Sequence, residues 1–195
     1  MSLPRRWAVF GLYVAAIYAS LPFGPRVGLA LLRMSSGGWL LGSGLPLLAF
    51  VGVGALFVRL IHRRAPWWAY AVLGGAGVGY TLAFSWLRAQ RLERTHLPEY
   101  GVVAWLAWRA IEPVLPGRFA TYVAAAMLTA VIGYGDELLQ RVVPGRYYDL
   151  RDVAMNALGG LLALLVLVAG RAGEPRHKAA VFSENAEIAT GTASR

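Results

Sequence analysis

The chain has 195 residues, of which 57% are hydrophobic and only 15% are charged, and its formal net charge is +9. An average globular protein carries about 25% charged residues, and long uncharged apolar stretches are typical of membrane spans. This composition excludes a soluble enzyme, and the complete lack of Cys excludes disulfides, thiolate metal sites and Cys nucleophiles.

The charged residues are unevenly distributed along the chain. Residues 1–92 contain nine Arg and no Asp or Glu, whereas most of the acids lie between residues 93 and 152. The Arg residues occur in short clusters between apolar stretches, so we interpret them as contacts to lipid headgroups and expect no nucleic-acid partner. The first half is therefore expected to anchor the chain, and the second half to carry its chemistry.

Six apolar stretches are long enough, or nearly so, to cross about 30 Å of hydrocarbon as helices. They lie at roughly 7–23, 39–61, 67–87, 98–115, 119–139 and 153–170. This pattern predicts an all-α, polytopic membrane protein, a bundle of about six transmembrane helices. The first stretch lacks a small-x-small cleavage pattern, so we expect an uncleaved anchor that can continue past Pro22 and Pro25 as a kinked helix.

The stretches divide the chain into three parts. Residues 1–89 are expected to form an N-terminal transmembrane anchor region of three helices. Residues 90–170 are expected to form a domain of three helices that holds a cluster of polar motifs. Residues 171–195 have little apolar content and are expected to form a flexible tail.

Polar segments flank the last three apolar stretches. Because successive spans alternate direction, the start of the fourth, the end of the fifth and the start of the sixth lie on one face of the membrane. A single polar pocket can therefore gather eight candidate residues: His96, Glu99, Asp136, Glu137, Gln140, Arg146, Asp152 and Asn156. Polar side chains inside a membrane helix are costly unless they are paired or face a cavity, so they are candidates for a functional site.

The spacing within each helix supports one shared pocket. Asp136 and Gln140 are four residues apart, so both can point to the same side of their helix. Asp152 and Asn156 have the same spacing in the last stretch. Glu137 and Arg141 are also four apart, and for this pair we expect an ordinary surface salt bridge.

Two of the candidate segments also have interpretations as helix ends. Pro98 suits a first helical position, which puts Glu99 in the first turn and leaves His96 just outside the helix. Asp152 suits the N-cap of the last helix, a structural role that competes with a role in the pocket.

Around these residues the chain resembles the VanZ-like family of bacterial membrane proteins, named for a teicoplanin-resistance protein. The resemblance covers about residues 90–170. Its elements are His96-x-x-Glu99-Tyr100, Asp136-Glu137-x-x-Gln140 followed by Pro144-Gly145-Arg146, and Asp152-x-x-x-Asn156-x-x-Gly159. It implies a small helical bundle in a bacterial membrane and names no substrate, because function belongs to sites rather than to folds.

The basic residues predict an orientation in the bacterial inner membrane. Six spans place both termini on the same side. When Arg141, Arg146 and Arg151 are set aside as residues of a site, the side of the termini holds more of the remaining Arg and Lys residues. Cytoplasmic loops carry the excess of basic residues, so we expect cytoplasmic termini and a pocket that faces outward.

The favoured function is a cell-envelope protein whose pocket binds a lipid-linked or headgroup-bearing ligand. Arg146, with Arg141 or Arg151, would hold phosphate or carboxylate, and Asp136, Glu137 or His96 would act as acid or base. The expected partners are membrane lipids and a lipid-linked envelope precursor. Binding such a precursor would connect the chain to teicoplanin susceptibility.

Three other functions remain open, so whether the chain is an enzyme is not decided by its sequence. A metal-dependent membrane hydrolase or transferase would bind Mg²⁺ or Mn²⁺ through His96, Glu99, Asp136, Glu137 and Asp152. A non-catalytic scaffold would use the same polar residues to join three helix ends. A small-solute transporter ranks lower, because the first three stretches lack intramembrane charges to line a path.

Overall fold

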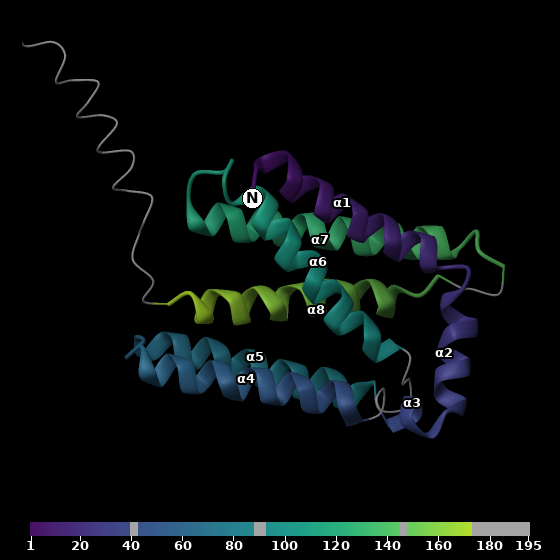
Figure 1. Ribbon diagram of the computed structural model, residues 1–195, viewed down its shortest axis with the longest axis horizontal. Helices are drawn as coiled ribbons and strands as arrows, with labels where there is room; N and C mark the ends of the chain where they lie inside the picture. The colour runs from purple at the N-terminus through teal and green to yellow at the C-terminus, as the bar shows by residue number, and fades with distance from the viewer. Residues whose placement is uncertain (40–42, 88–92, 145–147, 173–195) are drawn as a thin grey trace, which may run out of the picture.

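The computed structural model describes residues 1–39, 43–87, 93–144 and 148–172, and all the regular structure in these ranges is helical (Figure 1). The helices are α1 (Leu3–Ser20), α2 (Gly24–Arg33), α3 (Ser35–Trp39), α4 (Leu45–His62), α5 (Trp67–Trp86), the 3₁₀ helix η2 (Glu93–Thr95), α6 (His96–Ile111), α7 (Arg118–Gln140) and α8 (Leu150–Gly170). The predicted all-α class is confirmed for this part of the chain. Nearly all of the predicted tail lies outside the described residues.

Helix α8 lies at the centre of the bundle. Figure 1 shows α1, α6 and α7 on one side of α8, and α4 and α5 on the other side. The largest group of buried apolar side chains joins α1, α6, α7 and α8, and a second group joins α4, α5 and α8. The N-terminal helices therefore pack directly against the C-terminal ones.

Small residues allow α8 to approach its neighbours closely. A Cβ atom at Gly159 would lie 2.8 Å from the carbonyl oxygen of Leu97 in α6. A Cβ at Gly160 would lie 2.6 Å from Cγ2 of Thr129 in α7. Only glycine fits such approaches, which is how helices in membranes commonly pack.

The connection from α1 to α4 differs from the predicted kinked helix. Helix α1 ends at Ser20, and α2 is a separate helix with Pro25 in its first turn, where the missing N–H costs no helical hydrogen bond. In Figure 1, α2 lies across one end of the bundle instead of continuing along it. Its exposed surface includes both Val27 and Arg26, a mixture typical of a helix in the membrane surface.

Three helices of the described ranges, α4, α7 and α8, are long and apolar enough to cross a membrane. Helix α4 buries almost none of its surface and exposes Leu48, Phe50 and Val51, which would be unfavourable in water. Helix α6 has 16 residues, so it spans only about 24 Å of the roughly 30 Å of hydrocarbon. The membrane character of the chain is thus supported, whereas the count of six spans stays a prediction.

Candidate functional site

The last two turns of α7 hold three buried polar side chains that bond to one another. Asp136, Glu137 and Gln140 are 1%, 0% and 2% exposed. Nε2 of Gln140 donates to Oδ2 of Asp136 at 3.3 Å and to Oε1 of Glu137 at 2.8 Å. Spacings of three and four residues bring both carboxylates to one side-chain amide.

Glu137 does not form the predicted surface salt bridge with Arg141. Its carboxylate is buried, and Oε2 accepts a hydrogen bond from the backbone N–H of Asp149 at 3.3 Å. Arg141 lies exposed just after α7 and forms no ion pair with any described residue. Burial of a carboxylate is costly without donors, so Glu137 faces the segment before α8 and not the surface.

Asn156 is the most deeply buried polar side chain of α8. It is 0% exposed, and its Nδ2 donates to the backbone carbonyl of Gly133 in α7 at 3.3 Å. Its Oδ1 atom is buried and has no hydrogen-bond partner in the described ranges. Asn156 therefore joins α8 to α7 and keeps one acceptor atom unsatisfied.

Asp149, and not Asp152, is the N-cap of α8. The Asp149 side chain accepts a hydrogen bond from the backbone N–H of Arg151 at 2.8 Å. Asp152 lies in the first turn of the helix and is half-buried. A carboxylate in a first turn interacts favourably with the helix dipole.

The start of α6 supplies His96 and Glu99. His96 is the first residue of α6 and does not lie outside it, because the helix begins two residues before Pro98. Glu99 lies in the first turn, as predicted. Nδ1 of His96 is 3.7 Å from Oε2 of Glu99, and both side chains are partly exposed, so this pair forms the open edge of the site.

Tyr100 connects the α6 residues to the α7 residues. It is fully buried, lies beside the ring of His96 and interacts electrostatically with Asp136 and Glu99. Its hydroxyl oxygen is buried beside the carboxylate of Asp136. Tyr100 belongs to the motif His96-x-x-Glu99-Tyr100 but was not among the predicted pocket residues. The signal for it was its position four residues after His96.

Two further polar residues of this region were not predicted. The hydroxyl of Tyr18 in α1 donates to the carbonyl of Ile132 at 2.9 Å, and this side chain also interacts electrostatically with Asp136. Arg94 is only 6% exposed, and its Nε donates to the carbonyl of Leu87 at 3.1 Å. Tyr18 has no sequence signal, because α1 was expected to be only an anchor, whereas Arg94 lies two residues before His96 in the polar segment that precedes the fourth stretch.

We refer to the buried and half-buried residues at this end of the bundle as the polar cluster. It consists of His96, Glu99, Tyr100, Asp136, Glu137, Gln140 and Asn156. Figure 1 shows that α7 ends, and α6 and α8 begin, at this end of the bundle. The eighth predicted pocket residue, Arg146, lies outside the described residues. Within the described ranges, no group of three or more His, Asp or Glu side chains is placed to hold a metal ion.

A family model described as VanZ/LLP1 matches residues 10–171. The chain belongs to the VanZ/LLP1 family. The resemblance to VanZ-like proteins is thereby confirmed, and the matched region also includes the helices before residue 90. No curated protein and no solved structure matches the chain. Family membership and the three apolar helices identify a VanZ-like membrane protein.

Proposed function

We propose that this VanZ-like protein acts in the bacterial cell envelope and binds the headgroup of a lipid-linked ligand at the polar cluster. The supporting observation is that Oδ1 of Asn156, a buried acceptor of the cluster, has no hydrogen-bond partner in the described ranges. Buried polar atoms in proteins are nearly always hydrogen-bonded. Such an atom in a cluster that also holds two buried carboxylates favours a site completed by a polar ligand.

The chemistry of the cluster suits a headgroup rich in hydroxyl and amide groups. Asp136 and Glu137 supply acceptor oxygens, and the Tyr100 hydroxyl and the Asn156 amide supply both donors and acceptors. Arg146 would hold a phosphate of the same ligand, as the sequence analysis suggests. Six spans with cytoplasmic termini would place the cluster outside the cytoplasm, among envelope precursors, where binding would alter teicoplanin susceptibility.

A scaffold function is the second candidate, and a specific observation favours it. Gln140 bonds to both Asp136 and Glu137, and Glu137 accepts from the backbone of Asp149. The bond from Asp149 already joins α7 to the start of α8 without any ligand, and the bonds from Gln140 hold the two carboxylates in place. A scaffold predicts that substitutions in the cluster lower folding stability and any cellular phenotype together.

The substitution Tyr100→Phe distinguishes the two candidates, because it removes only a hydroxyl, which lies beside Asp136, and keeps the ring in the core. We expect Tyr100→Phe to change the unfolding temperature little. It should weaken binding of a polyisoprenyl-diphosphate-linked sugar by about threefold to tenfold, the value of one hydrogen bond. Native mass spectrometry of the detergent-purified protein, titrated with that lipid, measures the affinity.

Tyr18→Phe is the matched control, because it removes a hydroxyl that is bonded to the carbonyl of Ile132. It should lower the unfolding temperature and leave the affinity of the folded protein unchanged. If Tyr100→Phe instead loses stability and binds the lipid as well as the wild type, the scaffold function is correct and ligand binding is rejected. Teicoplanin susceptibility of cells that express each variant provides the cellular readout.

A further inference from the structure

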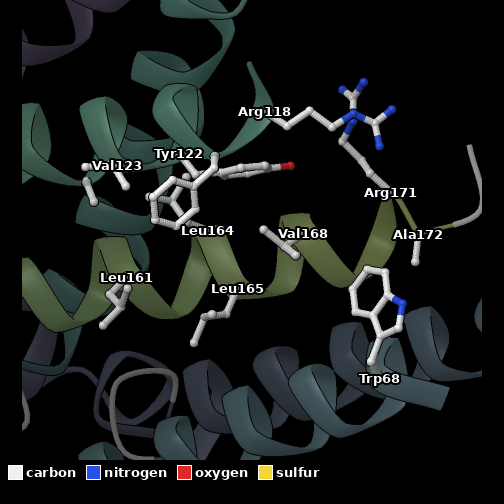
Figure 2. Close-up of a pocket in the computed structure, with 12 residues that line it drawn as sticks. Trp68, Arg118, Tyr122, Val123, Leu161, Leu164, Leu165, Val168, Arg171 and Ala172 are labelled. Atoms are coloured by element: carbon white, nitrogen blue, oxygen red, sulfur yellow. The ribbon is translucent and has the colours of Figure 1, made fainter. Parts of the chain in front are cut away.

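A cavity of about 480 Å³ lies between α7 and α8, at the end of the bundle opposite the polar cluster (Figure 2). Its walls are apolar. They include Leu161, Leu164, Leu165 and Val168 of α8, Val123 of α7 and Trp68 of α5. Its volume falls within the range of about 300–1,000 Å³ that is usual for small-molecule sites. The walls offer almost no hydrogen bonds, so they suit a hydrocarbon chain.

Two arginines lie at one end of this apolar cavity. Both Arg118, at the start of α7, and Arg171, just after the end of α8, line the cavity, and Figure 2 draws both at the same end of it. Arg171 is held in place, because its Nη2 donates to Oε1 of Glu112 at 3.3 Å and its guanidinium lies 4.5 Å from the ring centre of Trp108. Arg118 forms no hydrogen bond or ion pair with any described residue.

The charges near the cavity are not balanced. Glu112 is the carboxylate that pairs with Arg171, and it also lies 3.7 Å from Nη1 of Arg6. One negative charge is thus shared by two arginines, and Arg118 adds a third positive charge. Among the described residues, this end of the bundle therefore has an excess of positive charge beside an apolar cavity.

We propose that this cavity binds a membrane phospholipid with an anionic headgroup. One acyl chain fills the apolar space between α7 and α8, and the phosphate binds to Arg118 and Arg171. Guanidinium groups match phosphate oxygens in charge and geometry. The surplus positive charge favours a headgroup with net negative charge over a zwitterionic one. This site shares no residue with the polar cluster, so the proposal is independent of the function proposed there.

The test compares two lipids and two arginines. Delipidated protein in detergent is titrated with phosphatidylglycerol or with phosphatidylcholine, and native mass spectrometry measures the bound fraction. The wild type should prefer phosphatidylglycerol. Arg118→Gln should weaken phosphatidylglycerol binding by about fivefold, as expected for one arginine at a lipid surface, and change phosphatidylcholine binding little.

Arg59→Gln is the control, because Arg59 is an exposed arginine in the last turn of α4 that has no partner in the described ranges. It should bind both lipids as the wild type does. Leu165→Trp should fill the cavity and weaken binding of both lipids. Equal wild-type affinity for the two lipids, or equal losses in Arg118→Gln and Arg59→Gln, would overturn the proposal. Tyr100→Phe should leave phosphatidylglycerol binding intact, which separates this test from that of the polar cluster.

Discussion

Gly133 is a residue at which the three helices of the polar cluster come into close contact. A Cβ atom at this position would lie 2.7 Å from Cβ of Asn156 and 3.2 Å from Cε1 of Tyr100. Asn156 is bonded to the carbonyl of Gly133 itself, and Tyr100 is fully buried. Neither side chain can move away without breaking a contact, so a larger residue at position 133 would separate α7 from α6 and α8.

We predict that Gly133→Ala lowers the free energy of unfolding by about 1–3 kcal/mol, the usual effect of overpacking a buried contact. Thermal unfolding in detergent, followed by tryptophan fluorescence, measures the change. Gly75→Ala in α5 is the matched control, since no atom lies within 4 Å of its notional Cβ. The control should be neutral or stabilising by up to about 1 kcal/mol, the gain in helix propensity. Equal stability of the two variants would contradict the close contact at Gly133.

At the scale of residues, helical spacing predicts neighbours within one helix but not between helices. The spacing of Asp136 and Gln140 predicted that they share one side of their helix, and in the structure Gln140 donates a hydrogen bond to Asp136. Spacing could not predict the hydrogen bond from Tyr18 to the carbonyl of Ile132, because this contact depends on how α1 packs against α7. The prediction of a salt bridge between Glu137 and Arg141 was wrong for a related reason, because the burial of the side of α7 that carries Glu137 depends on α8.

Three helices meet at Glu112, directly after α6. Glu112 lies 3.7 Å from Arg6 of α1 and 3.3 Å from Arg171, which follows α8. Arg6 also donates from Nη1 to the carbonyl of Arg109 at 2.9 Å. All three charged side chains are only about a quarter to a third exposed, so this group joins the helix ends opposite the polar cluster.

We predict that Glu112→Gln lowers the free energy of unfolding by about 1 kcal/mol or less, because partly exposed ion pairs contribute little. The loss should become smaller at high salt, which screens such charges. A double-mutant cycle of Arg6→Gln and Glu112→Gln measures the coupling by thermal unfolding. Arg5→Gln, at an exposed neighbouring position, should show no coupling to Glu112→Gln. A coupling at Arg5 as large as that at Arg6 would contradict a specific interaction.

At the scale of elements, apolar runs predict helices better than they predict how helices connect. The runs correctly located α5, α7 and α8 to within a few residues. Pro22 and Pro25 suggested a kink, whereas the chain ends α1 and begins α2 in another direction. Proline shows where a helix is interrupted, but the direction taken afterwards depends on tertiary packing.

The orientation of the whole bundle can be measured by labelling because the chain has no Cys. Val142 follows α7 near the polar cluster, Val114 lies in the loop before α7, and both are exposed. With cytoplasmic termini, a membrane-impermeant maleimide should label Val142→Cys in whole cells and should label Val114→Cys only after lysis. The reverse pattern would place the polar cluster in the cytoplasm. Equal labelling of both would show that α7 does not cross the membrane.

At the scale of the molecule, alternation of the spans predicted that the start of α6, the end of α7 and the start of α8 lie together. Figure 1 shows this arrangement. The cavity at the other end had no sequence signal, because its walls come from side chains of three helices whose apolar residues look like ordinary lipid-facing or core positions. A pattern of apolar residues does not distinguish a filled interface from one that leaves space.

The close contact between Thr129 and Gly160 lies at the middle residue of α7 and at the middle residue of α8. The polar cluster lies toward one end of this helix pair, and the apolar cavity lies toward the other. The contact therefore lies midway along the helix pair, at nearly equal distance from its two ends. If α8 rocks about this point, one end of the pair widens while the other end narrows. In that case a ligand that separates the helices at one end would change the affinity for a ligand at the opposite end, and this coupling would be reciprocal.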